Sequence, residues 1–158
     1  PDAPILGWPA QSLERLRIAN RYGLFAVMTP ARYEIEFQGS MDGVTWTPYP
    51  YRFKPQALNE APGIYAPYQP RFEWNLWFAS LSSCEDQDWV LVAEARLLQG
   101  EPSVLRLFRD DPFHGARPKY VRTMTYQYWM TNLAQKRATG NWWRRDEIAP
   151  FCQEVGAD

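Results

Sequence analysis

The sequence predicts an α+β fold, in which a layer of helices packs against an antiparallel β-sheet or sandwich. Two parts of the 158-residue chain, 18–53 and 118–131, carry apolar runs or an apolar–polar alternation, and both patterns are typical of strands. Between them, from about 70 to 109, apolar residues recur at helical spacing. Because the helices form one block instead of alternating with the strands, the pattern favours α+β over α/β. We expect one soluble domain over 1–158.

The clearest strand is RYEIEFQ, at 32–38. Successive side chains of a strand leave opposite sides of the sheet. One face therefore carries Tyr33, Ile35 and Phe37, and the other carries Arg32, Glu34, Glu36 and Gln38. This alternation predicts a strand with one buried and one polar face.

A turn over 39–43 follows, where Asp42 and Gly43 suit the positive φ of a chain reversal. The aromatic run over 44–53 completes a hairpin, but Pro48 and Pro50 cannot donate ladder hydrogen bonds, so we expect an edge strand or a broken one. Ahead of the hairpin, the dense apolar run over 18–29 favours a buried strand. Four prolines between 54 and 70 exclude long regular structure there.

The helical block begins after Pro70. Four apolar residues lie at i, i+3, i+4 and i+7 of the segment 71–81, namely Trp74, Trp77, Phe78 and Leu81. A core face is the common use of such a stripe, and a ligand platform is the alternative. The segment 89–99 predicts a mostly buried helix that ends at Gly100, and Pro102 opens a short one.

A second strong strand is predicted over 118–131, with Tyr120, Met124, Tyr126, Tyr128 and Met130 on one face and Thr123, Thr125, Gln127 and Thr131 opposite. Arg122 falls among the apolar set. A charge there needs a partner, and we expect a carboxylate from Glu34, Glu36 or Glu73. The segment 132–140 is either a polar loop or a frayed helix.

The composition excludes several classes of function. A formal net charge of -1 argues against a nucleic acid or an anionic membrane as the partner. The chain has no run of about 18 apolar residues, so we expect that this piece does not span a membrane. It does not begin with methionine, so we expect either a processed protein or a domain cut from a longer one. Cys84 and Cys152 lack metal-ligand spacing, and they form either one disulfide or two buried thiols.

Nothing in the sequence predicts an enzyme, a cofactor or a metal site. His114 is the only histidine and lies in a Pro/Gly turn, whereas a general base or a zinc site needs placed partners. Ser40 is not in a nucleophile elbow, and there is no glycine-rich phosphate loop.

Aromatic and arginine residues in irregular segments are the remaining candidates for function. Interfaces favour Trp, Tyr and Arg, because a rigid ring buries much area at little entropic cost. We expect a protein-binding surface made of Tyr65, Tyr68, Gln69, Arg71, Trp142, Trp143 and Arg144. The alternative is that the rings only plug the ends of the sheet.

The chain also resembles the C-terminal domain of the lipase maturation factor family. The matching pieces, in order, are Tyr22-Gly23-Leu24-Phe25, Arg32-Tyr33-Glu34-Ile35, Gly39-Ser40, Asp42-Gly43, Trp46, Ala66-Pro67, Gln69-Pro70-Arg71, Trp74, Trp77-Phe78-Ala79, Leu97-Leu98, Gly100, Asp111-Pro112-Phe113, Lys119-Tyr120-Val121-Arg122 and Trp142-Trp143-Arg144. Six of these are expected to be structural residues of the motif, namely Arg32, Tyr33, Asp42, Gly43, Trp46 and Arg122.

The resemblance implies a function that composition cannot show. Members of that family are multi-pass membrane proteins with such a domain after the last span, and they are required for secreted lipases to become active. It implies a non-enzymatic folding-assistance domain with a protein client, possibly a lipase, attached to the membrane through the missing part. The domain would face the endoplasmic reticulum lumen in animals, or the periplasm in the bacterial-type relative that the composition suggests.

A second, shorter resemblance gives an alternative function. The hairpin turn over 39–43 is similar to those of discoidin-type sandwiches, whose loops bind sugars or lipid head groups.

Overall fold

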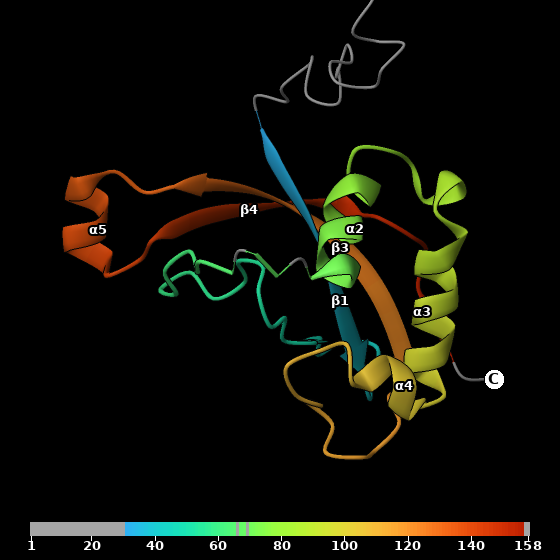
Figure 1. Cartoon of the computed structure of the whole chain (residues 1–158). Coiled ribbons are helices and arrows are strands. Elements are labelled where there is room, and N and C mark those ends of the chain that lie inside the picture. The colour runs from blue at the N-terminus through green and yellow to red at the C-terminus, as the bar shows by residue number, and fades with distance from the viewer. Residues whose placement is uncertain (1–30, 66, 69, 157–158) are drawn as a thin grey trace, which may run out of the picture. The chain divides into compact units, whose positions relative to one another are not determined.

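A computed structural model of the protein describes residues 31–156 except 66 and 69. These residues form an antiparallel sheet with several helices, which confirms the predicted α+β class (Figure 1). The strand predicted over 18–29 and residue Gln69 lie outside the described residues. The organisation of 1–158 as one domain stays a prediction.

The sheet has the strand order β2-β1-β3-β4, and β5 also pairs with β3. The strands are β1 (Arg32–Ser40), β2 (Thr47–Pro48), β3 (Tyr120–Met130), β4 (Trp143–Pro150) and β5 (Val155–Gly156). The long strands β1 and β3 are antiparallel, with Ile35 opposite Thr125. The two-residue length of β2 confirms the broken edge strand that the prolines predicted.

The sequence analysis missed β4, which lies on the other side of β3 from β1. The link between β3 and β4 is helix α5 (Leu133–Thr139), and Figure 1 shows it at the far end of this strand pair. Asn132 and Gln135 form a capping box at its start, and Gly140 ends it with a φ of 75°. The segment left open between a loop and a helix is therefore a capped helix.

The helical block contains α2 (Arg71–Ala79), a 3₁₀ turn η1 (Cys84–Asp86), α3 (Asp88–Leu98) and α4 (Pro102–Leu105). Gly100 follows α3 with a φ of 67°, and Pro102 opens α4, as the sequence predicted. The main core lies between these helices and one face of the sheet, and we call this side the helix-covered face. Its buried residues are Ile35, Phe37, Tyr49, Tyr51, Leu76, Ala79, Val90, Ala93, Leu97, Phe108, Val121 and Cys152.

Helix α2 turns a different face to the core from the one predicted. Glu73, Leu76 and Ala79 are buried, whereas Phe78 is 41% exposed. The carboxylate of Glu73 explains the rotation, because it accepts the backbone N–H groups of Arg52, Phe53 and Lys54 at 2.9, 2.9 and 2.6 Å. These donors lie in an irregular segment and would otherwise lack a partner. The prediction that Trp74, Trp77, Phe78 and Leu81 form the core face was wrong.

Cys84 and Cys152 form a disulfide, which decides the alternative that the sequence left open. It ties η1 to the turn after β4, and Cys152 is buried in the main core. The bond closes a segment with a sequence separation of 68 residues.

The opposite side of the sheet is also buried, and we call it the polar face. It carries Glu34, Glu36 and Gln38 of β1, Arg122, Tyr126 and Tyr128 of β3, and Arg145 of β4. Glu34, Glu36 and Gln38 are each at most 5% exposed, so the expectation of one buried face was wrong. Thr123, expected on a polar face, is likewise buried on the helix-covered side.

Each charged group of the polar face has a partner. Arg145 Nη1 lies 2.8 Å from Glu36 Oε2, and Gln56 Nε2 donates to the same oxygen at 3.0 Å. Arg122 donates from Nε to Gln38 Oε1 at 2.9 Å and lies over the Trp46 ring at 4.0 Å. The predicted carboxylate partner of Arg122 was therefore wrong, since an amide oxygen and a ring take that role.

Candidate binding pocket

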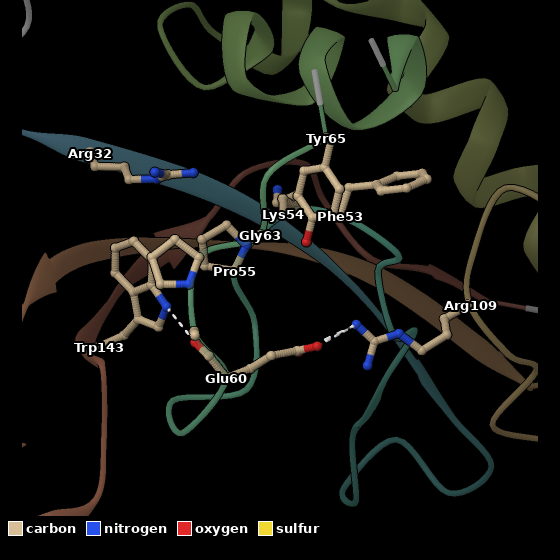
Figure 2. A pocket seen from close by; sticks show the side chains of 11 residues that line it. Arg32, Phe53, Lys54, Pro55, Glu60, Gly63, Tyr65, Arg109 and Trp143 are labelled. Carbon is tan, nitrogen blue, oxygen red and sulfur yellow. Dashed lines mark hydrogen bonds and ion pairs between the residues drawn. The ribbon is translucent and has the colours of Figure 1, made fainter. Parts of the chain in front are cut away.

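A pocket of about 230 Å³ lies where the start of β1, the start of β4 and the irregular segment after β2 meet. Its lining comes from residues distant in sequence, which are Arg32, Phe53, Lys54, Pro55, Glu60, Ala61, Pro62, Gly63, Tyr65, Arg109 and Trp143 (Figure 2). Cations and rings dominate this lining.

Glu60 forms one side of the pocket and is held from two directions. The Trp143 Nε1–H donates to the Glu60 carbonyl oxygen at 3.0 Å, and Arg109 Nη2 lies 3.1 Å from Glu60 Oε1 (Figure 2). The backbone N–H groups of Trp142 and Trp143 both donate to the Leu58 carbonyl oxygen, at 2.8 and 3.0 Å. Because the loop is fixed by these bonds, an irregular segment supplies a defined wall.

The opposite side is organised by Glu34, whose buried carboxylate binds two cations. Arg32 Nε lies 2.8 Å from its Oε1, and Lys54 Nζ lies 2.8 Å from its Oε2. Lys54 also donates to the Ile35 carbonyl oxygen at 2.7 Å and lies 4.4 Å from the centre of the Tyr51 ring. Burial of both Glu34 and Lys54 is tolerable because each charge is paired and hydrogen-bonded.

A cluster of three rings, Phe53, Tyr65 and Tyr68, borders the pocket, and we call it the loop aromatic cluster. The Phe53 centroid lies 5.0 Å from Tyr65 and 5.3 Å from Tyr68. Tyr65 is 37% exposed and Tyr68 is 61% exposed, so the cluster presents ring surface to solvent. Gly63 makes room for it, because a Cβ at this position would overlap the Tyr65 ring.

The structure brings together only part of the predicted binding surface. Tyr65 and Trp143 line the same pocket, and Tyr68 joins Tyr65 through Phe53. Trp143 is buried, however, and is a wall of the pocket instead of an exposed contact. Neither of the next two lines the pocket: Trp142 is half-buried beneath Lys136, and Arg144 lies over the Trp129 ring at 4.4 Å. Arg71 is exposed at the start of α2.

Sequence reasoning missed Lys54, Glu60 and Arg109 as pocket residues, and gave Arg32 only a structural role. Arg32 is two residues from Glu34 on one strand, a spacing that places both on the same face and is a usable signal. Lys54, Glu60 and Arg109 come from irregular segments whose paths depend on long-range bonds, so their local sequence carries no such signal.

The hairpin turn over 39–43 uses its polar groups within itself. The Asp42 carboxylate accepts the backbone N–H groups of Val44 and Thr45 at 2.9 and 2.7 Å and the Ser40 hydroxyl at 2.9 Å. These hydrogen bonds hold the pKa of Asp42 well below its usual value, with the Thr45 N–H as the largest cause. The turn is therefore self-capped, which does not favour the discoidin-like alternative.

No reactive constellation is evident in the part of the chain that the structure describes. Residues 31–156, without 66 and 69, hold no group of three or more His, Cys, Asp or Glu side chains placed to bind a metal ion. Burial raises the pKa of Glu94 to about 7, but this carboxyl lies in the main core beside Thr123, not at the pocket.

Comparison with known proteins places most of the chain in a family. A family model described as the lipase maturation factor C-terminal domain matches residues 18–153. The chain belongs to the lipase maturation factor family. The resemblance on which the sequence analysis relied is thereby confirmed.

Relatives of this family cover most of the chain. The chain is 37% identical to lipase maturation factor 2 of Gallus gallus over 94% of the chain's own length. It is 38% identical to the Homo sapiens protein of that name over 91% of its own length. Lipase maturation factor 1 of Mus musculus is 32% identical over 89%. The chain spans only 22%, 21% and 26% of these three relatives. No solved structure matches it. Among the described residues, no helix is both long and apolar enough to cross a bilayer.

Proposed function

We propose that this chain is a non-enzymatic partner-binding domain that assists the maturation of a client protein, with a secreted lipase as the first candidate. Family membership supports this role, because the relatives are named for lipase maturation. The observation that carries the proposal is the loop aromatic cluster, which exposes Tyr65 and Tyr68 beside a pocket. Incompletely folded proteins expose apolar segments, and rigid rings bind such segments at low entropic cost.

Backbone hydrogen bonds hold the loop aromatic cluster in place. Phe53 N–H is bound by the buried Glu73 carboxylate at 2.9 Å, and Tyr68 N–H donates to the Tyr65 carbonyl oxygen at 2.8 Å. Because the rings are positioned before a client arrives, little ordering entropy is lost on binding. The exposed faces are flat and lack charge, so they suit many apolar sequences instead of one. Such tolerance is what a folding-assistance surface requires.

We place the domain on the extracytoplasmic side of a membrane, in the compartment through which secreted proteins pass. The Cys84–Cys152 disulfide supports this placement, because structural disulfides persist in oxidising compartments such as the endoplasmic reticulum lumen and the periplasm. Membrane attachment would come from parts of the protein that correspond to the remainder of its longer relatives.

Co-purification with a refolding lipase tests the proposal. The chain, immobilised and challenged with a chemically unfolded lipase diluted from denaturant, should retain the lipase. The double variant Tyr65→Ala/Tyr68→Ala should retain much less of it, because most of the exposed ring surface of the cluster is gone. Phe78→Ala is the matched control, since Phe78 is 41% exposed but lies on α2 and does not line the pocket.

The melting temperature of each variant shows whether it is folded. Retention that is equal in the wild type and the Tyr65/Tyr68 variant, with both folded, would contradict the proposed surface. Loss of retention in Phe78→Ala alone would instead assign client binding to the outer face of α2.

A further inference from the structure

The pocket beside the loop aromatic cluster has a charge that the cluster lacks. Resting on the partner-binding function proposed above, we propose that this pocket binds a carboxylate of the client, while the neighbouring apolar residues of the same client segment pack on Phe53, Tyr65 and Tyr68. The recognised feature is then an acidic group adjacent to an apolar one. The carboxylate comes from an aspartate or glutamate side chain or from a chain terminus.

The charge of the lining supports this ligand class. Arg32, Lys54 and Arg109 contribute three positive charges, and Glu60 contributes one negative charge. Glu34, behind the lining, is shared by Arg32 and Lys54 at 2.8 Å each, so one carboxylate serves two cations. The pocket therefore keeps an excess of positive charge in a chain whose formal net charge is -1. An anion is favoured there over a neutral or cationic group.

The two guanidinium groups have donors left for a ligand. Arg32 uses Nε for Glu34, and Arg109 uses Nη2 for Glu60. No other acceptor among the described residues binds the side-chain N–H groups of Arg32 or Arg109. A guanidinium group pairs with a carboxylate through two parallel hydrogen bonds, which adds geometric selectivity to the charge.

The arginines are also positioned in advance. Arg32 is fixed by Glu34 and lies 5.3 Å from the centre of the buried Trp143 ring, which itself bonds to Glu60. Figure 2 shows Trp143 on the left, Glu60 below and Arg109 on the right, with Arg32 and the Tyr65 hydroxyl above them. Because these groups are already in place, a carboxylate entering between them needs little rearrangement of the protein.

The size of the cavity limits what enters it. Pockets that enclose drug-sized ligands span about 300 to 1,000 Å³, and this one is about 230 Å³. It therefore accommodates one side chain or one chain end, and the rest of the client segment must lie outside. The exposed rings of Tyr65 and Tyr68 are the adjoining apolar surface.

Fluorescence anisotropy with labelled ten-residue peptides tests the inference. Two amidated peptides share a Trp-Leu-Phe core and differ in one residue beside it, glutamate in the first and glutamine in the second. The third peptide has the sequence of the glutamine peptide, but it ends directly after the core in a free carboxyl terminus. Hydrogen bonds to charged groups are stronger than those to neutral ones, so a carboxylate peptide should bind at least about tenfold more tightly than the amidated glutamine peptide.

The protein variants link this preference to the pocket. Arg109→Gln should reduce the tenfold preference to about twofold or less, because its guanidinium donors are lost. Arg137→Gln is the matched control, since Arg137 is an exposed arginine on α5 that does not line the pocket. A preference for the first peptide assigns the bound carboxylate to a side chain, and a preference for the third assigns it to a chain end.

The outcomes separate this inference from the proposed function. Equal affinity for all three peptides overturns the carboxylate site, and so does a preference that Arg109→Gln leaves unchanged. If that equal binding is still lost in Tyr65→Ala/Tyr68→Ala, capture of apolar segments stands without the carboxylate. Absence of binding by every peptide overturns the inference as well, while the proposed function is then judged by the lipase retention assay.

Discussion

Along β1 both faces of the sheet are buried, but they are stabilised in different ways. On β1, Ile35 and Phe37 point to the helix-covered face, and Glu34 and Glu36 point to the polar face, yet all four are at most 3% exposed. Rings and aliphatic groups fill the helix-covered face, where the ring centroids of Phe37 and Phe108 lie 5.7 Å apart. The polar face is a network of charges and amides. An alternating strand therefore reveals which residues share a face, but not whether that face meets water.

This difference indicates that the two faces have different roles. Apolar burial is non-directional and supplies most of the folding free energy. A buried charge is tolerated only where partners surround it, so the polar face ties particular segments together. Glu36 reaches Arg145 of β4 and Gln56 of the irregular segment, and Glu34 reaches Lys54. We infer that the helix-covered face stabilises the domain and that the polar face positions the pocket.

The largest expected loss of stability comes from a substitution in the helix-covered face. Phe37→Ala should lower the free energy of unfolding by about 3 to 5 kcal/mol, because it removes a fully buried ring and leaves a cavity. Urea unfolding followed by tryptophan fluorescence measures it. A loss below about 1 kcal/mol would show that this face does not dominate the stability.

The disulfide is expected to have the next largest effect. Cys84→Ser/Cys152→Ser should lower the free energy of unfolding by about 2 to 4 kcal/mol, because the unfolded chain regains the freedom that the cross-link removed. Reduction of the wild type should give a similar shift in the urea midpoint. A double variant as stable as the oxidised wild type would contradict the role of this bond.

Glu94 gives the helix-covered face a pH dependence that Phe37 lacks. Burial raises its pKa from 4.5 to about 7, while Thr123 hydrogen-bonds its Oε1 at 2.8 Å. Between these values the folded protein holds a proton that the unfolded chain has released, so the stability falls as the pH rises through this range. The shift corresponds to about 3 kcal/mol as an upper bound.

The variant Glu94→Gln cannot titrate at this position and should lack this fall. Urea unfolding of both proteins from about pH 4 to pH 8 measures the difference. Parallel curves for the two proteins over this range would contradict the assignment to Glu94.

A substitution in the polar face should change the stability least, but it should also alter the pocket. Arg145→Ala should lower the free energy of unfolding by about 2 kcal/mol. This is less than the loss expected for a fully buried ion pair, because 27% of the Arg145 side chain is exposed. Its loss frees β4 from Glu36, so Trp143 should become more mobile. Arg144→Ala, which removes only an exposed cation–π contact, should cost less than about 1 kcal/mol. Similar losses for both variants would show that the Glu36–Arg145 pair adds no more stability than an exposed cation–π contact.

Much of the fold could be predicted because local sequence determines it. The period of two in 32–38, the prolines at 48 and 50 and the glycine at 100 each act locally, and the strand, the broken edge strand and the helix end that they predict are all present. The orientation of α2 could not be predicted, because it depends on Glu73 reaching donors about twenty residues away in sequence. Strand β4 was missed because its RRDE run is wholly charged and has no apolar period.

The candidate site was predictable only in its ring content. Tyr65 and Trp143 were identified as binding residues from residue type and irregular context, and both line the pocket. Their joint location depends on bonds from Leu58 and Glu60 to the Trp142–Trp143 segment, which lies more than eighty residues away. Long-range bonds of this kind leave no local pattern, and the cationic lining was missed for the same reason.

Site-specific photocrosslinking tests most directly whether the loop aromatic cluster is the client surface. A photoreactive phenylalanine analogue replaces Tyr68, 61% exposed in the cluster, or Phe78, 41% exposed on α2, in otherwise identical chains. Each chain is irradiated with a lipase that is refolding from denaturant. We expect a crosslinked lipase from position 68, little from position 78, and none once the lipase is fully folded. Crosslinking from position 78 without any from position 68 would contradict this expectation.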